Sequence, residues 1–125
     1  MLGHTNAIAN IAVRDLGRAK NFYIGTLGLS EVEAMGDEVA VLKSGSTLVN
    51  VYRSDYAGTN KATAVTWAVG GDIDRLVKEL KTKGISFEHY DLPETKREGD
   101  IHVFGDIRVA WFKDPDGNIL NLINQ

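Results

Sequence analysis

Few residues of this 125-residue chain could carry out acid–base or metal chemistry. There are three histidines, His4, His89 and His102, and no cysteine. Histidine can bind a metal or exchange a proton near neutral pH, whereas the lack of cysteine excludes disulfides, thiolate metal sites and thiol catalysis. A histidine metal site or general base is one interpretation. The other is structural, with His4 in a frayed terminus and His89 and His102 flanking a loop. His102 is the first to test, because that loop could fold over a binding site.

Three asparagines, Asn10, Asn50 and Asn121, lie in segments that otherwise have the composition of strands. Asparagine is depleted in strands, and a buried amide needs hydrogen-bond partners. The three could bind a polar ligand, or they could pair with one another or with trapped water, and the sequence leaves both readings open. Tyr52 follows Asn50 by two residues, so it shares a strand face with Asn50 and could supply a hydroxyl group or a ring.

A hairpin predicted over 108–123 supplies the last candidates. If Asn121 faces a binding site, alternation across the turn places Val109 and Trp111 on the same face, and Phe112 on the opposite one. Trp111 would then stack on a ligand, although a role in the core is the alternative. Trp67 is expected on the helix side by the same alternation.

The elements that must position these residues are duplicated. Each half has a short β-branched run, then a helix that begins with aspartate and carries arginine three residues later, then a hairpin. The segments are 8–13, 15–24 and 39–52 in the first half, and 64–69, 72–81 and 108–123 in the second. The offset grows from 57 at the helices (72 − 15) to 71 at the hairpins (121 − 50), so the second half carries a longer loop. A duplicated β-α-β-β-β unit is expected to place its functional site between the copies.

Local signals define the ends of these elements. Asp15 and Asp72 are predicted to cap the two helices, and Gly28 and Gly84 to end them. The expected apolar helix positions are Ala19, Phe22, Tyr23 and Leu27 in the first helix, and Ile73, Leu76, Val77 and Leu80 in the second. Residues 114–117 (Asp-Pro-Asp-Gly) form a strong turn signal. Residues 54–62 are a polar linker, and 91–99 are a charged loop within a possible lid over 91–106. Two short helices with about eight strands predict an α+β fold in one domain over 1–125, with modules at about 5–53 and 63–125.

Composition limits the range of functions. A content of 43% hydrophobic and 25% charged residues is ordinary for a globular protein, and the net charge is −3. Acidic and basic residues alternate without a basic stripe, so nucleic acid is not an expected partner. No stretch approaches the length of a membrane span, and no apolar N-terminal signal is present. A cytoplasmic protein is expected.

Two motifs carry a resemblance to a known superfamily. Residues 13–19 (Val-Arg-Asp-Leu-Gly-Arg-Ala), followed by Phe22-Tyr23 and Leu27-Gly28-Leu29, resemble the opening of vicinal oxygen chelate proteins, and 112–118 resemble their closing hairpin. This superfamily includes glyoxalase I, bleomycin- and fosfomycin-resistance proteins and extradiol dioxygenases. Residues 57–62 and 87–90 are similar to small glyoxalase-like members without an assigned function. The resemblance implies two βαβββ modules whose curved mixed sheet encloses a cavity.

The resemblance also implies where a metal would bind. Relatives that use a metal ligate it with His, Gln or Glu at four inward positions, which correspond here to Ile8, Asn50, Ala64 and Asn121. Two aliphatic residues and two carboxamides are poor ligands for a divalent metal, so no metal or other cofactor is expected. None of the histidines falls on these four positions.

The main functional hypothesis is therefore a metal-free protein that binds a small organic molecule in its cavity. The residues expected to line this cavity are Asn10, Asn50, Tyr52, Val109, Trp111 and Asn121. In fosfomycin-resistance relatives, the positions of Val109 and Trp111 contact substrate. A metal-independent lyase or isomerase that uses His102 or Tyr52 is the alternative, followed by a glyoxalase I-type metalloenzyme. The resemblance also implies a homodimer, with no nucleic acid or membrane partner.

Overall fold

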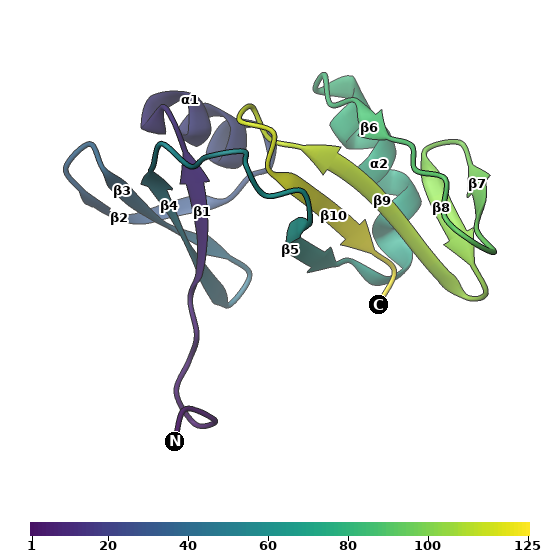
Figure 1. The fold of residues 1–125 in the computed structure, drawn as a ribbon, viewed down its shortest axis with the longest axis horizontal. Helices are drawn as coiled ribbons and strands as arrows, with labels where there is room; N and C mark the ends of the chain where they lie inside the picture. The colour runs from purple at the N-terminus through teal and green to yellow at the C-terminus, as the bar shows by residue number, and fades with distance from the viewer. The chain divides into compact units, whose positions relative to one another are not determined.

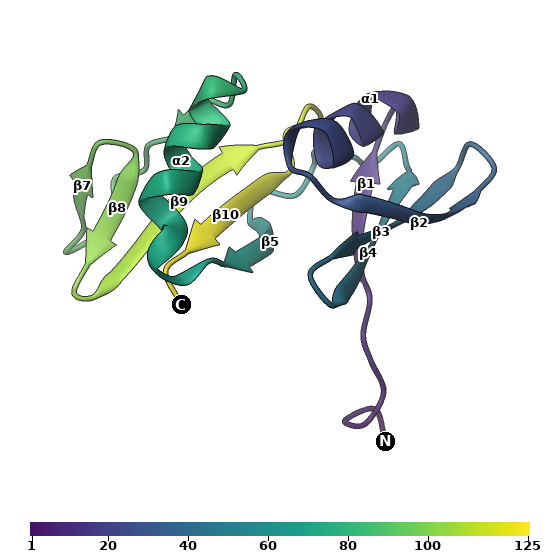
Figure 2. The ribbon, with the colours of Figure 1, turned by 180° about the vertical axis from the view of Figure 1, so that it is seen from behind.

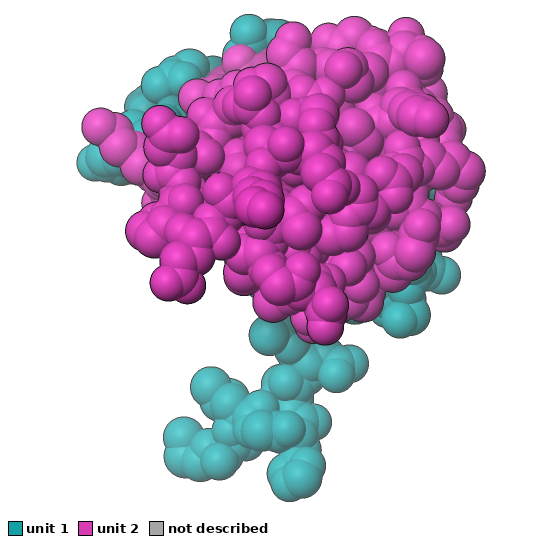
Figure 3. Space-filling model, turned by 90° about the vertical axis from the view of Figure 1, so that its right-hand side faces the viewer, with its two compact units in different colours: residues 1–59 teal, residues 60–125 magenta. Residues whose placement is uncertain are grey.

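The computed structural model describes residues 1–125, apart from the side chain of Met35. The chain divides into two compact units, Met1–Thr59 and Asn60–Gln125, which are coloured separately in Figure 3. The boundary falls inside the polar segment 54–62. No helix among the described residues is long and apolar enough to cross a membrane.

Unit 1 is built on a four-stranded mixed sheet (Figure 1). Its strands are β1 (Ala9–Val13), β2 (Ser30–Met35), β3 (Val39–Ser44) and β4 (Thr47–Arg53), in the order β1-β4-β3-β2. β1 runs parallel to β4, and the other two pairings are antiparallel. β1 and β4 are the first and last strands of the unit, so they bring residues 9–13 and 49–53 side by side.

One helical segment packs with this sheet. It begins as α1 (Leu16–Lys20) and continues as a π-helix, η1 (Asn21–Thr26). The predicted cap is confirmed, since the Asp15 carboxylate accepts a hydrogen bond from the Arg18 N–H at 2.9 Å. The predicted stop is confirmed as well, because Gly28 has φ +83°, which favours glycine.

The two faces of the unit 1 sheet differ in burial. Alternate residues on one face are buried with the helical segment: Ile11, Val13, Ala40, Leu42, Val49 and Val51. The opposite face, which we call the open face of unit 1, carries Asn10, Asn50 and Tyr52, none of which is fully buried. The alternation predicted from the sequence therefore holds in this unit.

Unit 2 contains a six-stranded mixed sheet with the order β5-β10-β9-β8-β7. The strands are β5 (Thr63–Ala68), β6 (Phe87–Glu88), β7 (Lys96–Glu98), β8 (Ile101–Phe104), β9 (Ile107–Lys113) and β10 (Ile119–Ile123). β6 and β8 share one edge of β9, with β6 pairing residues 111–112 and β8 pairing residues 107–109.

Helix α2 (Ile73–Thr82) lies over one face of this sheet, after a short 3-10 turn, η2 (Gly70–Asp72) (Figure 2). Its buried residues are Ile73, Val77 and Leu80. On the strands, Phe112 is fully buried and stacks with Trp67 at a ring distance of 6.5 Å. Phe112 and Trp67 therefore lie on the helix face, as alternation predicted.

Asp72 departs from the sequence prediction. It occupies the N-cap position of α2, but its side chain forms no capping hydrogen bond. Its carboxylate instead lies 3.5 Å from the guanidinium of Arg75. The preceding turn already has helical geometry, so Asp72 lacks the extended backbone that the capped Asp15 adopts.

Three strands were missed by the sequence analysis, β2, β7 and β8, and the described chain has ten strands rather than about eight. β2 and β7 lie at sheet edges, and all three residues of β7 (Lys-Arg-Glu) are exposed. Charged residues are common on edge strands, which they protect from pairing with another chain, and they leave no alternating apolar signal. The segment expected to be a charged loop or lid is therefore a hairpin, β7–β8, which accounts for the longer second half. The predicted α+β class is confirmed, and the strands form two mixed sheets, one in each unit.

Candidate functional site

The candidate site lies on the face of the unit 2 sheet opposite α2, which we call the open face of unit 2. Asn121 on β10 pairs with Trp111 on β9, and Val109 on β9 pairs with His102 on β8. Because paired residues share a face and alternate residues repeat it, these four side chains lie on one surface. Val109, Trp111 and Asn121 therefore share one strand face, as alternation predicted.

An aromatic cluster, formed by Tyr90, His102 and Trp111, occupies this face. The ring of His102 stands almost perpendicular to that of Trp111, at 84° and a centroid distance of 4.9 Å. Tyr90 meets Trp111 at 77° and 5.4 Å, and its ring lies 6.1 Å from His102. Such edge-to-face contacts stabilise ring pairs and hold each ring in one orientation.

His102 is the most buried member of the cluster, with 1% of its surface exposed. Its Nε2 accepts a hydrogen bond from the backbone N–H of Tyr90 at 2.9 Å, so the ring proton of the neutral imidazole is on Nδ1. Burial lowers the pKa of His102 below its usual value, which favours this neutral form. The interpretation that His102 flanks a loop is wrong, since the residue lies in β8 and faces the site.

Several polar atoms of this face are buried without a hydrogen-bond partner in the described structure. They are Nδ1 of His102, the hydroxyl oxygen of Tyr90 and the side-chain oxygen of Asn121. A buried unpaired polar atom is destabilising by about 1–3 kcal/mol, so native proteins usually satisfy such groups. Trp111 differs, because its indole N–H donates to the hydroxyl of Thr63 at 3.1 Å.

Charged groups surround the cluster. Glu88 on β6 pairs in register with Trp111 and therefore lies on the same face. Its carboxylate forms an ion pair with the ammonium of Lys113 at 3.0 Å. The exposed Arg97 on β7 pairs in register with His102 and lies on the same face. Burial, followed by the charge of Glu88, raises the pKa of Tyr90, so its hydroxyl stays protonated at neutral pH.

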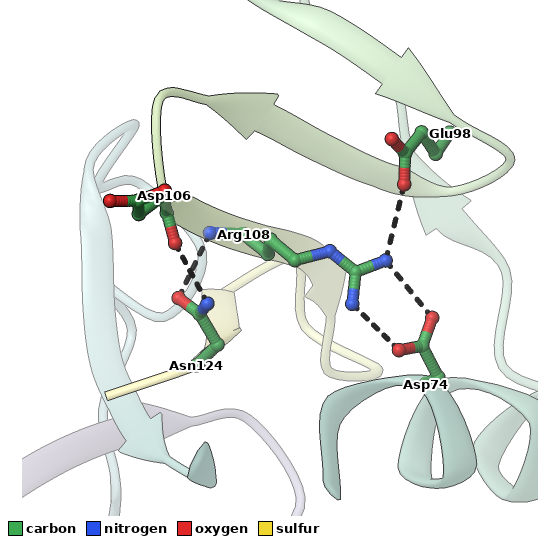
Figure 4. A network of polar contacts seen from close by, with 5 residues as sticks. All are labelled: Asp74, Glu98, Asp106, Arg108 and Asn124. Atoms are coloured by element: carbon green, nitrogen blue, oxygen red, sulfur yellow. Dashed lines mark hydrogen bonds and ion pairs between the residues drawn. The ribbon is translucent and has the colours of Figure 1, made fainter. Parts of the chain in front are cut away.

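Ion pairs attach the β7–β8 hairpin, which carries His102, to the rest of unit 2. Arg108 on β9 binds both carboxylate oxygens of Asp74 on α2, at 2.6 and 3.0 Å, and reaches Glu98 on β7 at 3.3 Å (Figure 4). Its backbone N–H also donates to Asn124 at 2.9 Å. The hydrogen bonds from Arg108 lower the pKa of Asp74, and those to Asp74 raise the pKa of Arg108.

A second set of polar contacts involves His89. Asp100, between β7 and β8, accepts from Lys81 on α2 at 2.7 Å and lies 2.8 Å from Nε2 of His89. Hydrogen bonds from Lys81 and then His89 lower the pKa of Asp100. His89 therefore has the structural role that the sequence left open, while His4 is exposed near the N-terminus.

The other predicted site residues lie on the open face of unit 1. Asn10 pairs in register with Asn50, and Tyr52 shares their face. The amide of Asn10 donates to the backbone carbonyl of Ile8 at 3.3 Å, whereas the side-chain oxygen of Asn50 is buried and unpaired. Tyr52 has 36% of its surface exposed.

Tyr90 and Thr63 were missed by the sequence analysis. Tyr90 follows Glu88, the last residue of β6, by two residues, so continuing the alternation of β6 would have placed it on the same face as Trp111. Thr63 has no such signal, because a register shift at Ile119 and Leu120 interrupts the pairing of β10 with β5 next to it.

The fold and this site geometry can be compared with known proteins. The sequence profile of the Glyoxalase/Bleomycin resistance protein/Dioxygenase superfamily matches residues 2–122. The chain belongs to this superfamily.

Solved structures of this superfamily share the fold at low sequence identity. An integron cassette protein from the mobile metagenome of the Halifax Harbour sewage outfall has a TM-score of 0.73 at 18% identity, over 98% of this chain and 99% of that one. The lactoylglutathione lyase of Agrobacterium tumefaciens has a TM-score of 0.72 at 14% identity, covering 98% and 95% of the two chains. The fosfomycin resistance protein FosX of Mesorhizobium loti has a TM-score of 0.70 at 16% identity, covering 100% and 94%. A comparison with curated proteins gives no match.

Some glyoxalase-superfamily proteins bind a metal, so we tested whether the residues of this chain fit one. The positions implied by the resemblance hold Ile8, Asn50, Ala64 and Asn121, of which Ile8 and Ala64 are exposed and have no donor atom. The two asparagines offer neutral amide oxygens, which bind divalent metals weakly without carboxylate or imidazole partners. Within the described part of the chain, no three His, Cys, Asp or Glu residues are grouped to hold a metal ion. The residues at these four positions therefore do not fit a divalent metal ion.

Proposed function

We propose that this protein binds a small organic molecule on the open face of unit 2, without a divalent metal. The observation that carries the proposal is the aromatic cluster together with the buried polar atoms of the same face that have no hydrogen-bond partner. Nδ1 of His102 and the side-chain oxygen of Asn121 are both buried on this face and have no partner. A ligand that stacks on the aromatic rings and bonds to these atoms would remove the penalty of leaving them unpaired.

The residues of unit 1 extend this proposal. Asn50 has a buried, unpaired amide oxygen on the open face of unit 1, at the position that matches Asn121 in the duplicated sequence. Asn10 and Tyr52 share that face. We include all three as ligand-binding candidates, together with Val109, Trp111 and Asn121.

A metal-independent isomerase or lyase is the second candidate function. It is favoured by the tautomer of His102. The hydrogen bond from the Tyr90 N–H to Nε2 keeps the proton of the neutral imidazole on Nδ1. A neutral imidazole N–H can donate to a substrate carbonyl oxygen as negative charge develops there. Tyr52 is the other candidate for proton transfer, since its hydroxyl is partly exposed.

The proposal includes a symmetric pair of chains. Two-fold pairing is the commonest assembly of soluble oligomers, and the superfamily resemblance makes it the expected state for a chain of this length. No nucleic-acid or membrane partner is proposed, because the net charge is −3 without a basic stripe.

The test is a thermal-shift screen of metabolites and aromatic antibiotics. A ligand at 100 times its dissociation constant stabilises the folded state by about 2.7 kcal/mol, which gives a clear rise in melting temperature. Trp111→Leu should abolish the rise for a true ligand. Phe104→Leu is the matched control, because Phe104 is an exposed aromatic residue of the same strand face and lies outside the cluster.

Two results decide between the candidates. A ligand that is recovered unchanged after long incubation supports binding alone, and one that is converted at a rate reduced by His102→Gln supports the enzyme. A ligand whose shift is equal in the native protein and Trp111→Leu would contradict the proposed site.

A further inference from the structure

We infer that the ligand of the open face of unit 2 is an uncharged, flat aromatic molecule with a hydrogen-bond acceptor at one end and a donor at the other. This inference rests on the proposed function and adds the chemical class of the ligand. It follows from the order of three side chains across the sheet and from the absence of an unpaired charge at their centre.

The order of the side chains sets the shape of the ligand. Trp111 on β9 lies between Asn121, its partner on β10, and His102 on β8, which pairs with Val109 two residues away. Neighbouring strands are about 4.8 Å apart and the two residues are offset by two positions along β9, so the backbones of Asn121 and His102 are separated by about 12 Å. A ring stacked over Trp111 would reach both with substituents at its opposite ends.

The chemistry of the end groups sets the polarity of the ligand. His102 uses Nε2 as an acceptor for the Tyr90 N–H, so its Nδ1 is a donor. Nδ1 has no partner with hydrogen-bond geometry, although the Val109 backbone lies close enough to raise the pKa of His102, and an acceptor on the ligand would complete this donor. The buried oxygen of Asn121 is an acceptor and requires a donor. The two ends of the site therefore have opposite requirements, and a ligand that carried only acceptors or only donors at both ends would leave one of them unsatisfied.

The charges around the cluster set the charge of the ligand. Glu88 and Lys113 neutralise each other at 3.0 Å, and burial keeps His102 in its neutral form. An ionised ligand would lose its hydration against neutral groups without gaining a counter-ion, which is unfavourable. The cation on this face, Arg97, is exposed at the sheet edge, where water screens its attraction for an anion.

Three probes of one shape and different charge provide the test: 4-hydroxybenzamide, 4-hydroxybenzoate and 4-hydroxybenzylamine. The readout is the indole N–H signal of Trp111 in two-dimensional NMR. The chain has two tryptophans, and Trp67→Phe identifies their signals, since Trp67 lies on the helix face. The neutral amide should move the Trp111 signal and bind about 10-fold more tightly than either charged probe, which corresponds to about 1.4 kcal/mol.

Variants of the site sharpen the result. Asn121→Leu should reduce the affinity for 4-hydroxybenzamide, because it removes the acceptor at one end. Arg97→Gln is the matched control and should leave that affinity unchanged.

Three outcomes would overturn the inference. If 4-hydroxybenzoate binds as tightly as the amide and loses affinity in Arg97→Gln, the ligand is anionic, and the proposed binding function still stands. If none of the probes moves the Trp111 signal at millimolar concentration, while the thermal-shift screen finds a ligand that depends on Trp111, the inferred chemical class of the ligand is wrong. The proposed binding site on the open face of unit 2 then still stands. If both experiments are negative, the inference and the proposed function fail together.

Discussion

The turn between β9 and β10 allows a sharp test of how the candidate site is held, because both strands carry site residues. Asp114 is 5% exposed, and its Oδ1 accepts from the backbone N–H groups of Asp116 at 2.9 Å and Asn118 at 2.8 Å. Its Oδ2 accepts from the side-chain amide of Asn118 at 2.7 Å. The turn predicted over 114–117 is confirmed, and the Asp114 carboxylate holds it together.

We expect Asp114→Ala to lower the free energy of unfolding by about 3 kcal/mol. Each hydrogen bond to a charged group contributes about 1.5–3 kcal/mol, but bonds within one turn are not additive, and the substitution leaves a buried N–H of Asn118 unpaired. Asp114→Asn keeps one acceptor oxygen and should lose about half as much. For a chain of this size, 3 kcal/mol corresponds to a fall of about 10 °C in melting temperature.

The assay is urea unfolding followed by tryptophan fluorescence, with the dependence on urea concentration compared between variants. Asp106→Ala is the matched control, because Asp106 lies in the turn at the other end of β9 and binds Asn124 through its backbone carbonyl. Alanine keeps that carbonyl, so the control should stay within about 0.5 kcal/mol of the native protein. The reasoning is refuted if Asp114→Ala is no more destabilising than Asp106→Ala.

Three further predictions concern the pH dependence, the metal content and the assembly. The pKa of His102 is lower in the folded state than its unfolded value near 6.5. The contribution of neutral His102 to the free energy of unfolding is therefore complete above about pH 6.5 and is lost as the pH falls towards the folded pKa, by about 1.36 kcal/mol for each unit by which the pKa is lowered. Unfolding curves between pH 5 and 7 should show this slope for the native protein and lose it in His102→Gln. Elemental analysis should find no stoichiometric zinc, nickel or iron, given Ile8, Asn50, Ala64 and Asn121 at the four implied positions, and one tightly held metal per chain would contradict this. Light scattering at micromolar concentration should give about twice the chain mass of 13.7 kDa, and a constant monomer mass would argue against the pair of chains.

Signals within a few residues determined much of the fold. Asp15 begins a helix by binding the Arg18 N–H three residues away, and Gly28 ends it because its backbone has a positive φ. The 114–117 turn joins two strands in a register that alternation then extends to Val109, Trp111 and Asn121. These features depend on residues that are close together in the chain, so they can be predicted from the sequence alone.

Tertiary structure alone decided the site around those three residues. β2 and β7 form because a neighbouring strand offers its hydrogen bonds, and their own exposed residues carry no strand pattern. The β7–β8 hairpin then brings His102 beside Trp111, nine residues along the chain, and Tyr90 closes the cluster through a contact with a residue 12 positions away. The neutral state of His102 follows from burial by this packing. Residue types and spacing name the chemical groups, but long-range pairing decides which of them meet and in which protonation state.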